Sequence, residues 1–159
     1  MSVAAEPRGR WDGRHRAREA ALRALYQMAV GGLDAATAVQ LTMTADDDGV
    51  ALDAEQQGFA LRLAGGAWAA RTELDAIIEP LSTNWRLDRL AVVDHLVLRL
   101  AIHEWLAEPG TPPRVVLSEA LDLAREYSGE AAVRFVNGVL DAAYRQLRDD
   151  GRIIEQAGS

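Results

Sequence analysis

The spacing of apolar residues constrains the fold of this chain more than any other feature of its sequence. Apolar residues recur three and four positions apart along almost the whole chain, which is the period of an α-helix. No segment rich in Val, Ile and Thr alternates apolar and polar residues in the manner of a β-strand. The segment 92–106 is apolar nearly all round, which predicts the central helix of the core. The sequence therefore predicts an all-α protein.

The length of 159 residues fits one domain with a substantial core. We expect a single helical domain over residues 13–149, preceded by a disordered arm at 1–12 and followed by a flexible tail at 150–159. Within this domain the apolar pattern predicts helices over 13–30, from about 34 onward, and over 53–81, 92–106, 111–127 and 130–149.

Several residues indicate where these helices begin. Asp34 and Thr111 are of the types that commonly cap a helix N-terminus. Asp53, with Gln56 three residues later, has the composition of a capping box.

Residues 65 and 66 are two glycines inside a predicted helix, where each costs about 1 kcal/mol of helix stability relative to alanine. We expect this pair to mark a place where another helix packs closely.

Basic residues are concentrated near the amino end of an otherwise acidic chain. Residues 8–23 hold six of the 17 basic residues and only two acids, a net charge of +4, although the whole chain carries −7. Arg14, Arg16 and Arg18 fall within this run, beside His15. Such a local concentration suggests an anionic partner. The alternative, a solvated first turn that keeps the terminus soluble, stays open on charge alone.

The last predicted helix carries the run Arg134-Phe135-Val136-Asn137-Gly138, in which asparagine and glycine are poor helix formers. Phe135 lies within two turns of the helix start, where backbone N–H groups favour anions. An exposed Phe135 beside Arg134 would stack on a base and hold a phosphate. In the alternative, Phe135 belongs to the core and Gly138 lets another helix approach.

The sequence offers little for catalysis or cofactor binding. There is no cysteine, no glycine-rich phosphate loop and no nucleophile elbow. His95 and His103 are eight residues apart on one predicted helix, about 12 Å of rise, which is too far for the two to share a metal alone. An acidic loop at 46–49 fits a calcium-loop register only partly. We expect no enzyme activity, no metal and no cofactor.

No apolar stretch reaches the roughly 18 to 20 residues of a membrane span.

Four segments, in this order, resemble the NusB family of transcription antitermination factors: the arginine-rich run from Arg14, Leu98-Arg99-Leu100-Ala101 with Glu104, Glu119-Ala120-Leu121-Asp122, and Phe135-Val136-Asn137-Gly138. The resemblance covers about residues 13–147. It implies a bundle of seven helices in two subdomains. It also implies a non-catalytic, cytoplasmic adaptor that binds the boxA element of ribosomal RNA leader transcripts with the ribosomal protein NusE, in an RNA polymerase antitermination complex.

The resemblance also implies which residues meet each partner. Those expected to bind single-stranded RNA are Arg14, His15, Arg16, Arg18, Arg134 and Phe135. Tyr26 and Asp94 fall where the family meets NusE. We expect the Arg16→Ala, Arg18→Ala double change to weaken RNA binding without unfolding the chain.

Four positions depart from the family pattern. Ala131 and Ala132 stand where family members often carry an acidic and a small polar residue, His103 replaces a tyrosine, and Ser118 replaces an asparagine. The two alanines leave open an alternative function, a homodimeric protein–protein interaction module of the same fold with weak or lost RNA binding.

Overall fold

The computed structural model describes residues 10–44, 52–82 and 91–153, and the acidic loop expected at 46–49 lies outside these ranges. The described residues form seven α-helices, one 3-10 turn and no strand, which confirms the all-α prediction. The elements are α1 (Arg10–Gly31), α2 (Ala35–Thr44), α3 (Ala54–Ala69), α4 (Arg71–Ile78), η1 (Glu79–Leu81), α5 (Val92–Ala107), α6 (Pro113–Tyr127) and α7 (Glu130–Asp149). None of these helices combines the length and the apolar character that crossing a membrane requires.

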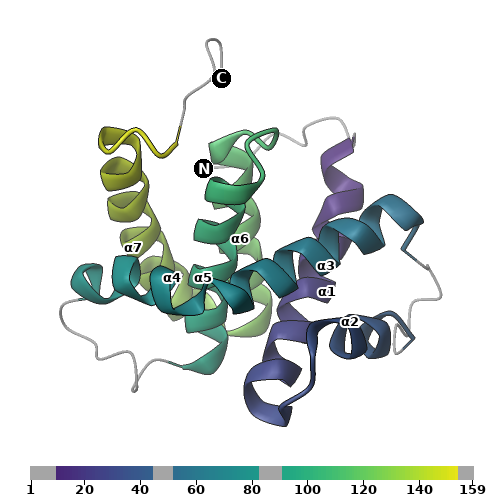
Figure 1. Cartoon of the computed structure of the whole chain (residues 1–159). Coiled ribbons are helices and arrows are strands. Elements are labelled where there is room, and N and C mark those ends of the chain that lie inside the picture. Colours follow the sequence, from purple (N-terminus) through teal and green to yellow (C-terminus); the bar gives the residue numbers. More distant parts are fainter. Residues whose placement is uncertain (1–9, 45–51, 83–90, 154–159) are drawn as a thin grey trace.

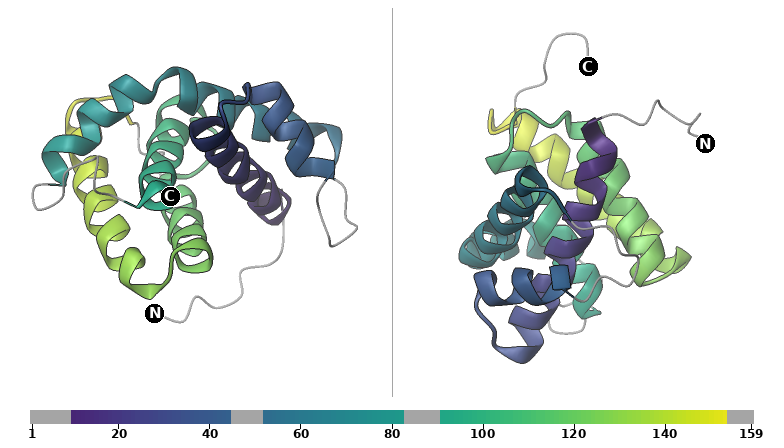
Figure 2. Two further views of the ribbon diagram at one scale, coloured as in Figure 1. Left: turned by 90° about the horizontal axis from the view of Figure 1, so that it is seen from below. Right: turned by 90° about the vertical axis from the view of Figure 1, so that its right-hand side faces the viewer.

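The helices form two packed groups that share one core. α1, α2 and α3 pack against one another, as do α5, α6 and α7 (Figure 1). The α3–α4 segment crosses one side of the molecule, from contacts with α1 and α2 at one end to contacts with α7 at the other. Figures 1 and 2 both place α6 between α1 and α7. This arrangement determines which predicted site residues can meet.

The predicted central helix is α5, which contacts α1, α3, α4, α6 and α7. Leu98 and Ile102 on this helix are fully buried. Trp105 Nε1 donates a hydrogen bond of 3.0 Å to the carbonyl oxygen of Pro113, and its ring lies 5.6 Å from that of Tyr144 on α7. One tryptophan therefore joins the end of α5 to both later helices.

Two of the three predicted helix caps are confirmed. The backbone N–H of Thr37 donates to Asp34 Oδ1 at 2.7 Å, and Asp53 and Gln56 form the full capping box. Thr111 was predicted to cap α6, but this is wrong, because the N-cap is Pro112 and makes no side-chain capping bond. The two prolines at 112–113 lack N–H groups, so the first turn has fewer donors for a cap to satisfy.

The helix expected over 53–81 is interrupted. Ala70 leaves helical geometry at φ −92° and ψ 8°, and α4 begins at the next residue. The Arg71 guanidinium donates to the carbonyl oxygen of Trp68 at 2.8 Å and so satisfies an acceptor at the break. The division produces the seventh helix that the family resemblance implied and the helical periodicity did not show.

The two ends of the domain also differ from expectation. α1 begins at Arg10, so residues 10–12, expected in a disordered arm, are helical, and no proline or glycine between 10 and 12 prevents this. At the other end, Gly151 has φ +74° and its N–H donates to Arg148, while the N–H of Arg152 donates to Leu147. This is a Schellman motif. It directs Ile153 into the core, where it is 6 % exposed, so residues 150–153 are not a loose tail.

Two glycines inside helices differ in the space around them: Gly66 is closely packed and Gly138 is open. A Cβ on Gly66 would lie 2.2 Å from His103 Nε2, which confirms close packing of α3 and α5 at the predicted place. Gly138 was expected to admit a neighbouring helix, but it is exposed and a Cβ there would meet nothing within 4 Å. Packing within the described chain therefore does not explain Gly138.

Candidate functional site

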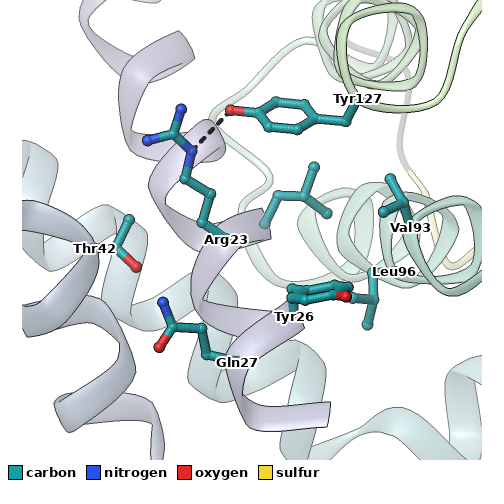
Figure 3. A pocket seen from close by; sticks show the side chains of 8 residues that line it. Arg23, Tyr26, Gln27, Thr42, Val93, Leu96 and Tyr127 are labelled. Carbon is teal, nitrogen blue, oxygen red and sulfur yellow. Dashed lines mark hydrogen bonds between the residues drawn. The ribbon is translucent and has the colours of Figure 1, made fainter. Parts of the chain in front are cut away.

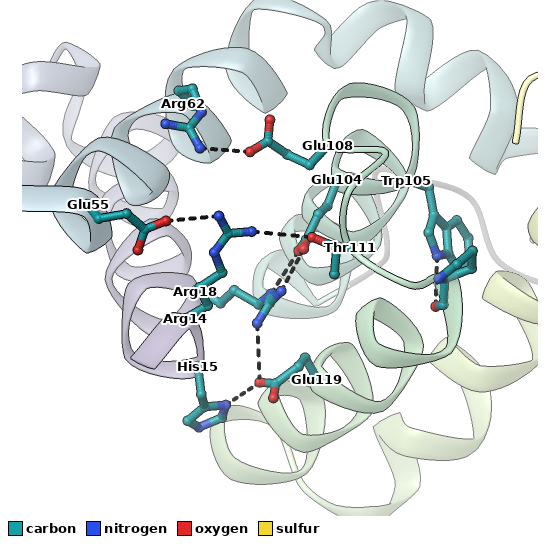
Figure 4. A network of polar contacts seen from close by, with 11 residues as sticks. Arg14, His15, Arg18, Glu55, Arg62, Glu104, Trp105, Glu108, Thr111 and Glu119 are labelled. Carbon is teal, nitrogen blue, oxygen red and sulfur yellow. Dashed lines mark hydrogen bonds and ion pairs between the residues drawn. The ribbon is translucent and has the colours of Figure 1, made fainter. Parts of the chain in front are cut away.

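Arg18, expected to contact RNA, is instead buried between α1 and α5. Its side chain is 2 % exposed, and its Nε and Nη2 donate to the two carboxylate oxygens of Glu104 at 2.8 and 2.7 Å (Figure 4). The remaining nitrogen, Nη1, is buried with no hydrogen-bond partner among the described residues and lies 4.0 Å from Glu119. The expectation that Arg18 holds an RNA phosphate is corrected, because this guanidinium is an internal connection between helices.

Arg14 lies one turn earlier on the same face of α1 and is partly accessible. Its Nη2 donates to Glu55 at 2.8 Å, and its side chain is 22 % exposed against 58 % for the glutamate. The Arg14 guanidinium also stacks over the Phe59 ring, 4.2 Å from the centroid. Because the carboxylate partner is exposed, a phosphate can replace it at modest cost.

Phe59 gathers three guanidinium groups that the sequence had not connected. Arg18 and Arg62 lie 5.3 and 5.6 Å from its centroid, in addition to Arg14. Each arginine has its own carboxylate, and that of Arg62 is Glu108 at 2.9 Å (Figure 4). Phe59 and Arg62 are three residues apart and so share a helix face, but nothing in the spacing shows that α1 lies against that face.

His15 is held by two glutamates. Its Nδ1 contacts Glu119 on α6, and its Nε2 lies 2.9 Å from Glu19 on α1. The hydrogen bond with Glu119, opposed by burial and aided by both carboxylate charges, raises the pKa of His15 to about 9. The ring is therefore cationic near neutral pH, but both of its nitrogens are engaged. Direct contact of His15 with RNA would require breaking one of these contacts.

The other predicted RNA contacts lie on two different helices. Arg16 is half-buried on α1, whereas Arg134 is exposed on α7 and has no ion-pair partner among the described residues. Phe135 is half-buried and packs on the core, so its ring is only partly available for stacking. Since α6 separates α1 from α7 (Figure 2), the structure does not gather these residues into one cluster. An RNA strand that touches the predicted contacts on α1 as well as those on α7 has to pass over α6.

A groove of about 400 Å³ opens beside Tyr26, one of the two predicted partner-binding residues (Figure 3). The side chains that line it are Leu22, Arg23, Tyr26, Gln27, Thr42, Val93, Leu96 and Tyr127. Tyr26 is 44 % exposed. Arg23 Nε donates to the hydroxyl of Tyr127 at 3.0 Å, and burial raises the pKa of that hydroxyl. The groove thus has an apolar floor and polar groups at its edge, as ligand and peptide sites do.

Asp94, the second predicted partner-binding residue, follows the groove residue Val93 in the first turn of α5. Its Oδ1 is buried and accepts no hydrogen bond from the described residues. A buried acceptor without a donor costs free energy, so this oxygen is suited to a donor from outside the chain.

His95 and His103 lie in separate environments. His95 Nε2 lies 2.6 Å from Asp75 Oδ1 on α4, in a cluster that also includes Arg99. His103 lies against Gly66, and burial lowers the pKa of its ring. The two rings therefore belong to contacts between different helices.

Comparison with known proteins identifies close relatives over nearly the whole chain. A sequence model of the NusB family matches residues 15–145. The transcription antitermination protein NusB of Symbiobacterium thermophilum is 38 % identical over 139 residues, covering 85 % of this chain and 91 % of that protein. The NusB of Koribacter versatilis is 39 % identical over 134 residues, covering 84 % of this chain and 90 % of that protein.

Solved structures show the same fold. The structure of NusB from T. maritima superposes with a TM-score of 0.74 at 32 % identity and covers 84 % of this chain and 91 % of that one. A chain in a crystal structure of antitermination factors NusB and NusE in complex with dsRNA gives a TM-score of 0.75 at 28 % identity, covering 85 % of this chain and 98 % of that one.

Proposed function

This chain belongs to the NusB family, and we propose that it is a non-enzymatic RNA-binding adaptor of transcription antitermination. In this proposal it binds the boxA element of ribosomal RNA leader transcripts together with NusE, as part of an RNA polymerase antitermination complex in the cytoplasm. The observation that carries the proposal is the match to a chain of the NusB–NusE–dsRNA structure. The present chain covers 98 % of that matched chain.

The RNA contacts that we propose are Arg14, Arg16, Arg134 and Phe135. Arg134 is the clearest of these, because it is exposed near the start of α7 and no described carboxylate pairs with it. Arg14 contributes by exchanging the exposed Glu55 for a phosphate. Arg18 acts indirectly, because its pair with Glu104 keeps α1 in place against α5.

The groove beside Tyr26 is the surface that we propose for NusE. The exposed tyrosine presents an aromatic ring at its rim, a residue type common at the centre of interfaces. Asp94 lies beside the groove with a buried oxygen that has no donor, so we expect an N–H group or cation of the partner to bind it.

The second candidate function is a homodimeric protein–protein interaction module with weak or lost RNA binding. The observation that favours it is the exposure of large apolar residues on α1 and at the start of α5: Tyr26, Val30 and Val92 are 44, 61 and 46 % exposed. Such side chains can pack against a second copy as well as against another protein. Sedimentation of the protein alone shows directly whether it self-associates.

Fluorescence anisotropy with a boxA-like RNA, with and without NusE, tests the proposed function. We expect weak binding by the protein alone and tighter binding with NusE, because few arginine–phosphate contacts are available on this chain. No binding in either case, together with a stable dimer, would support the second candidate.

A further inference from the structure

A cluster of titratable side chains between α1 and α6 has no part in the proposed contacts with RNA and NusE. His15 and Glu19 lie one turn apart on α1, and Glu126 lies in the last turn of α6. A ring nitrogen of His15 and one carboxylate oxygen of each glutamate all lie within 4.8 Å of one another. These three residue types are common ligands of divalent transition metals.

Two neighbouring groups orient two of the three members of this cluster, His15 and Glu19. Glu119 binds His15 Nδ1 (Figure 4) and leaves Nε2 directed toward Glu19 Oε1, 2.9 Å away. The hydroxyl of Tyr127 donates to the other oxygen of Glu19, Oε2, at 3.2 Å. A carboxylate on the second ring nitrogen is the usual support of a metal-binding histidine. The ligand atoms of His15 and Glu19 are therefore oriented by Glu119 and Tyr127, which are not ligands themselves.

The charge of the cluster favours a cation. Glu19, Glu119 and Glu126 contribute three carboxylates against the one ring of His15, so two negative charges remain even when the ring is protonated. The Arg18 guanidinium, 4.0 Å from Glu119, is neutralised by its two hydrogen bonds to Glu104, and Arg23, which donates to the Tyr127 hydroxyl, offsets the negative charge only in part. A divalent ion would balance this excess.

We propose that His15, Glu19 and Glu126 form a binding site for a divalent transition metal, with Zn²⁺ as the ion that fits this ligand set. Three protein ligands and one water complete the tetrahedral coordination of an open zinc site, and the imidazole disfavours Mg²⁺. Ligand atoms around tetrahedral zinc are about 3.4 Å apart. The 2.9 Å contact between His15 and Glu19 has to open slightly, and the exposed Glu126 has to move inward.

Binding of the ion exchanges it for the proton on His15 Nε2, which is released. The bound metal would join the arginine-bearing end of α1 to the end of α6 through two residues of one helix and one of the other. This site does not depend on the proposed RNA function, because none of its ligands needs RNA or NusE to be present.

Isothermal titration of the tag-free, chelator-treated full chain with Zn²⁺ at pH 8 tests the proposal, with Mg²⁺ as a second titrant. We expect one Zn²⁺ per chain and no response to Mg²⁺. Glu126→Gln should weaken zinc binding about tenfold or more, since losing even a supporting residue of a metal site costs 10–100-fold. Glu126 is exposed, so this change leaves the fold intact.

Asp122→Asn is the matched control, because Asp122 is an exposed acid one turn earlier on α6 and not a member of the set. Because its charge acts on His15 without being a ligand, this change should weaken zinc binding far less than Glu126→Gln does. Absence of zinc binding at 100-fold excess over the protein, equal binding of Mg²⁺, or equal weakening by the two variants would each overturn the proposal.

Discussion

Arg18 and Glu104 form a buried, two-pronged ion pair that joins the amino-terminal helix to the central helix. Both side chains are 2 % exposed, and the two hydrogen bonds measure 2.8 and 2.7 Å. Because neither charged group reaches water, the attraction between the two has to offset the free-energy cost of burying each of them. An arginine from the basic run is therefore part of the core rather than of the surface.

Arg18→Ala should destabilise the protein by about 3–5 kcal/mol, because it leaves Glu104 buried without a partner. Urea denaturation followed by circular dichroism measures this loss. A combined Arg18→Met, Glu104→Met change should recover much of the stability, since no buried charge then remains.

The control for this prediction is Arg145→Ala, which removes an exposed ion pair with Asp141 one turn away. We expect a change within about 0.5 kcal/mol. Equal stabilities of the Arg18→Ala and Arg145→Ala variants would contradict the buried role of Arg18. For the same reason, the Arg16→Ala, Arg18→Ala double change cannot serve as a test of RNA binding with the fold unchanged.

Gly66→Ala should destabilise the protein by about 1–3 kcal/mol, because the new Cβ would lie 2.2 Å from His103 Nε2. Thermal unfolding measures the effect. Adding His103→Ala removes the clash, so Gly66→Ala should cost much less in that background. Equal costs in both backgrounds would show that the ring is not the obstacle.

Gly138→Ala should have the opposite effect on stability to Gly66→Ala. The position is exposed on α7 and a Cβ there meets nothing, so alanine should stabilise the helix by about 1 kcal/mol. If Gly138 exists to let a partner approach, the same variant should bind RNA or NusE more weakly despite its higher melting temperature. A destabilised variant would contradict the open environment of Gly138.

Asp75 should contribute to stability against acid. Burial alone would raise the pKa of its carboxyl, but hydrogen bonds from Arg99 and His95 outweigh burial and lower the pKa below 3.8. The folded pKa therefore lies below the unfolded one. The contribution is present above the unfolded pKa and is lost as pH falls through the folded value.

Urea midpoints measured from pH 6 down to pH 2.5 test this contribution. The Asp75→Asn variant should be less stable than the unchanged chain at pH 6, and the difference should shrink toward the acid end. A difference that stays constant with pH would exclude Asp75 as its source.

Tyr26→Ala should weaken NusE binding by about 2 kcal/mol, a factor of roughly 30, because a partly exposed tyrosine at a groove is the kind of residue on which interfaces depend. Isothermal titration with NusE measures the affinity. Leu61→Ala is the control, since Leu61 is similarly exposed, at 42 %, but lies on α3 outside the groove lining. Equal affinities of the two variants would place NusE elsewhere.

Helix content, several helix ends and the central position of α5 could be predicted from the sequence, because they depend on local signals. The capping box at Asp53 and the cap at Asp34 are short-range patterns that tertiary packing leaves intact. The break at Ala70 has no such signal, since alanine favours helix and the nearest glycines and proline are several residues away.

Which arginines of the basic run are buried and which are accessible could be decided only from the structure, although the sequence contains one signal for the burial of Arg18. Arg18 lies four and seven residues before Leu22 and Leu25, both buried, so helical periodicity assigns it to the core face. Arg16, two positions away, lies about 200° around the helix from Arg18. The partners of that face, Phe59 and Glu104, are far away in the sequence, and no local pattern connects them to α1.

The salt dependence of RNA affinity for paired arginine variants tests the RNA interface most directly. Anisotropy titrations of a boxA-like RNA with the protein and NusE, at several salt concentrations, should show Arg134→Ala weakening the affinity and reducing the log–log slope by about 0.7, the share of one phosphate contact on single-stranded RNA. Arg148→Ala, at the other end of α7 and beside Asp149, should change neither quantity. Equal affinities and slopes for the two variants would contradict the account.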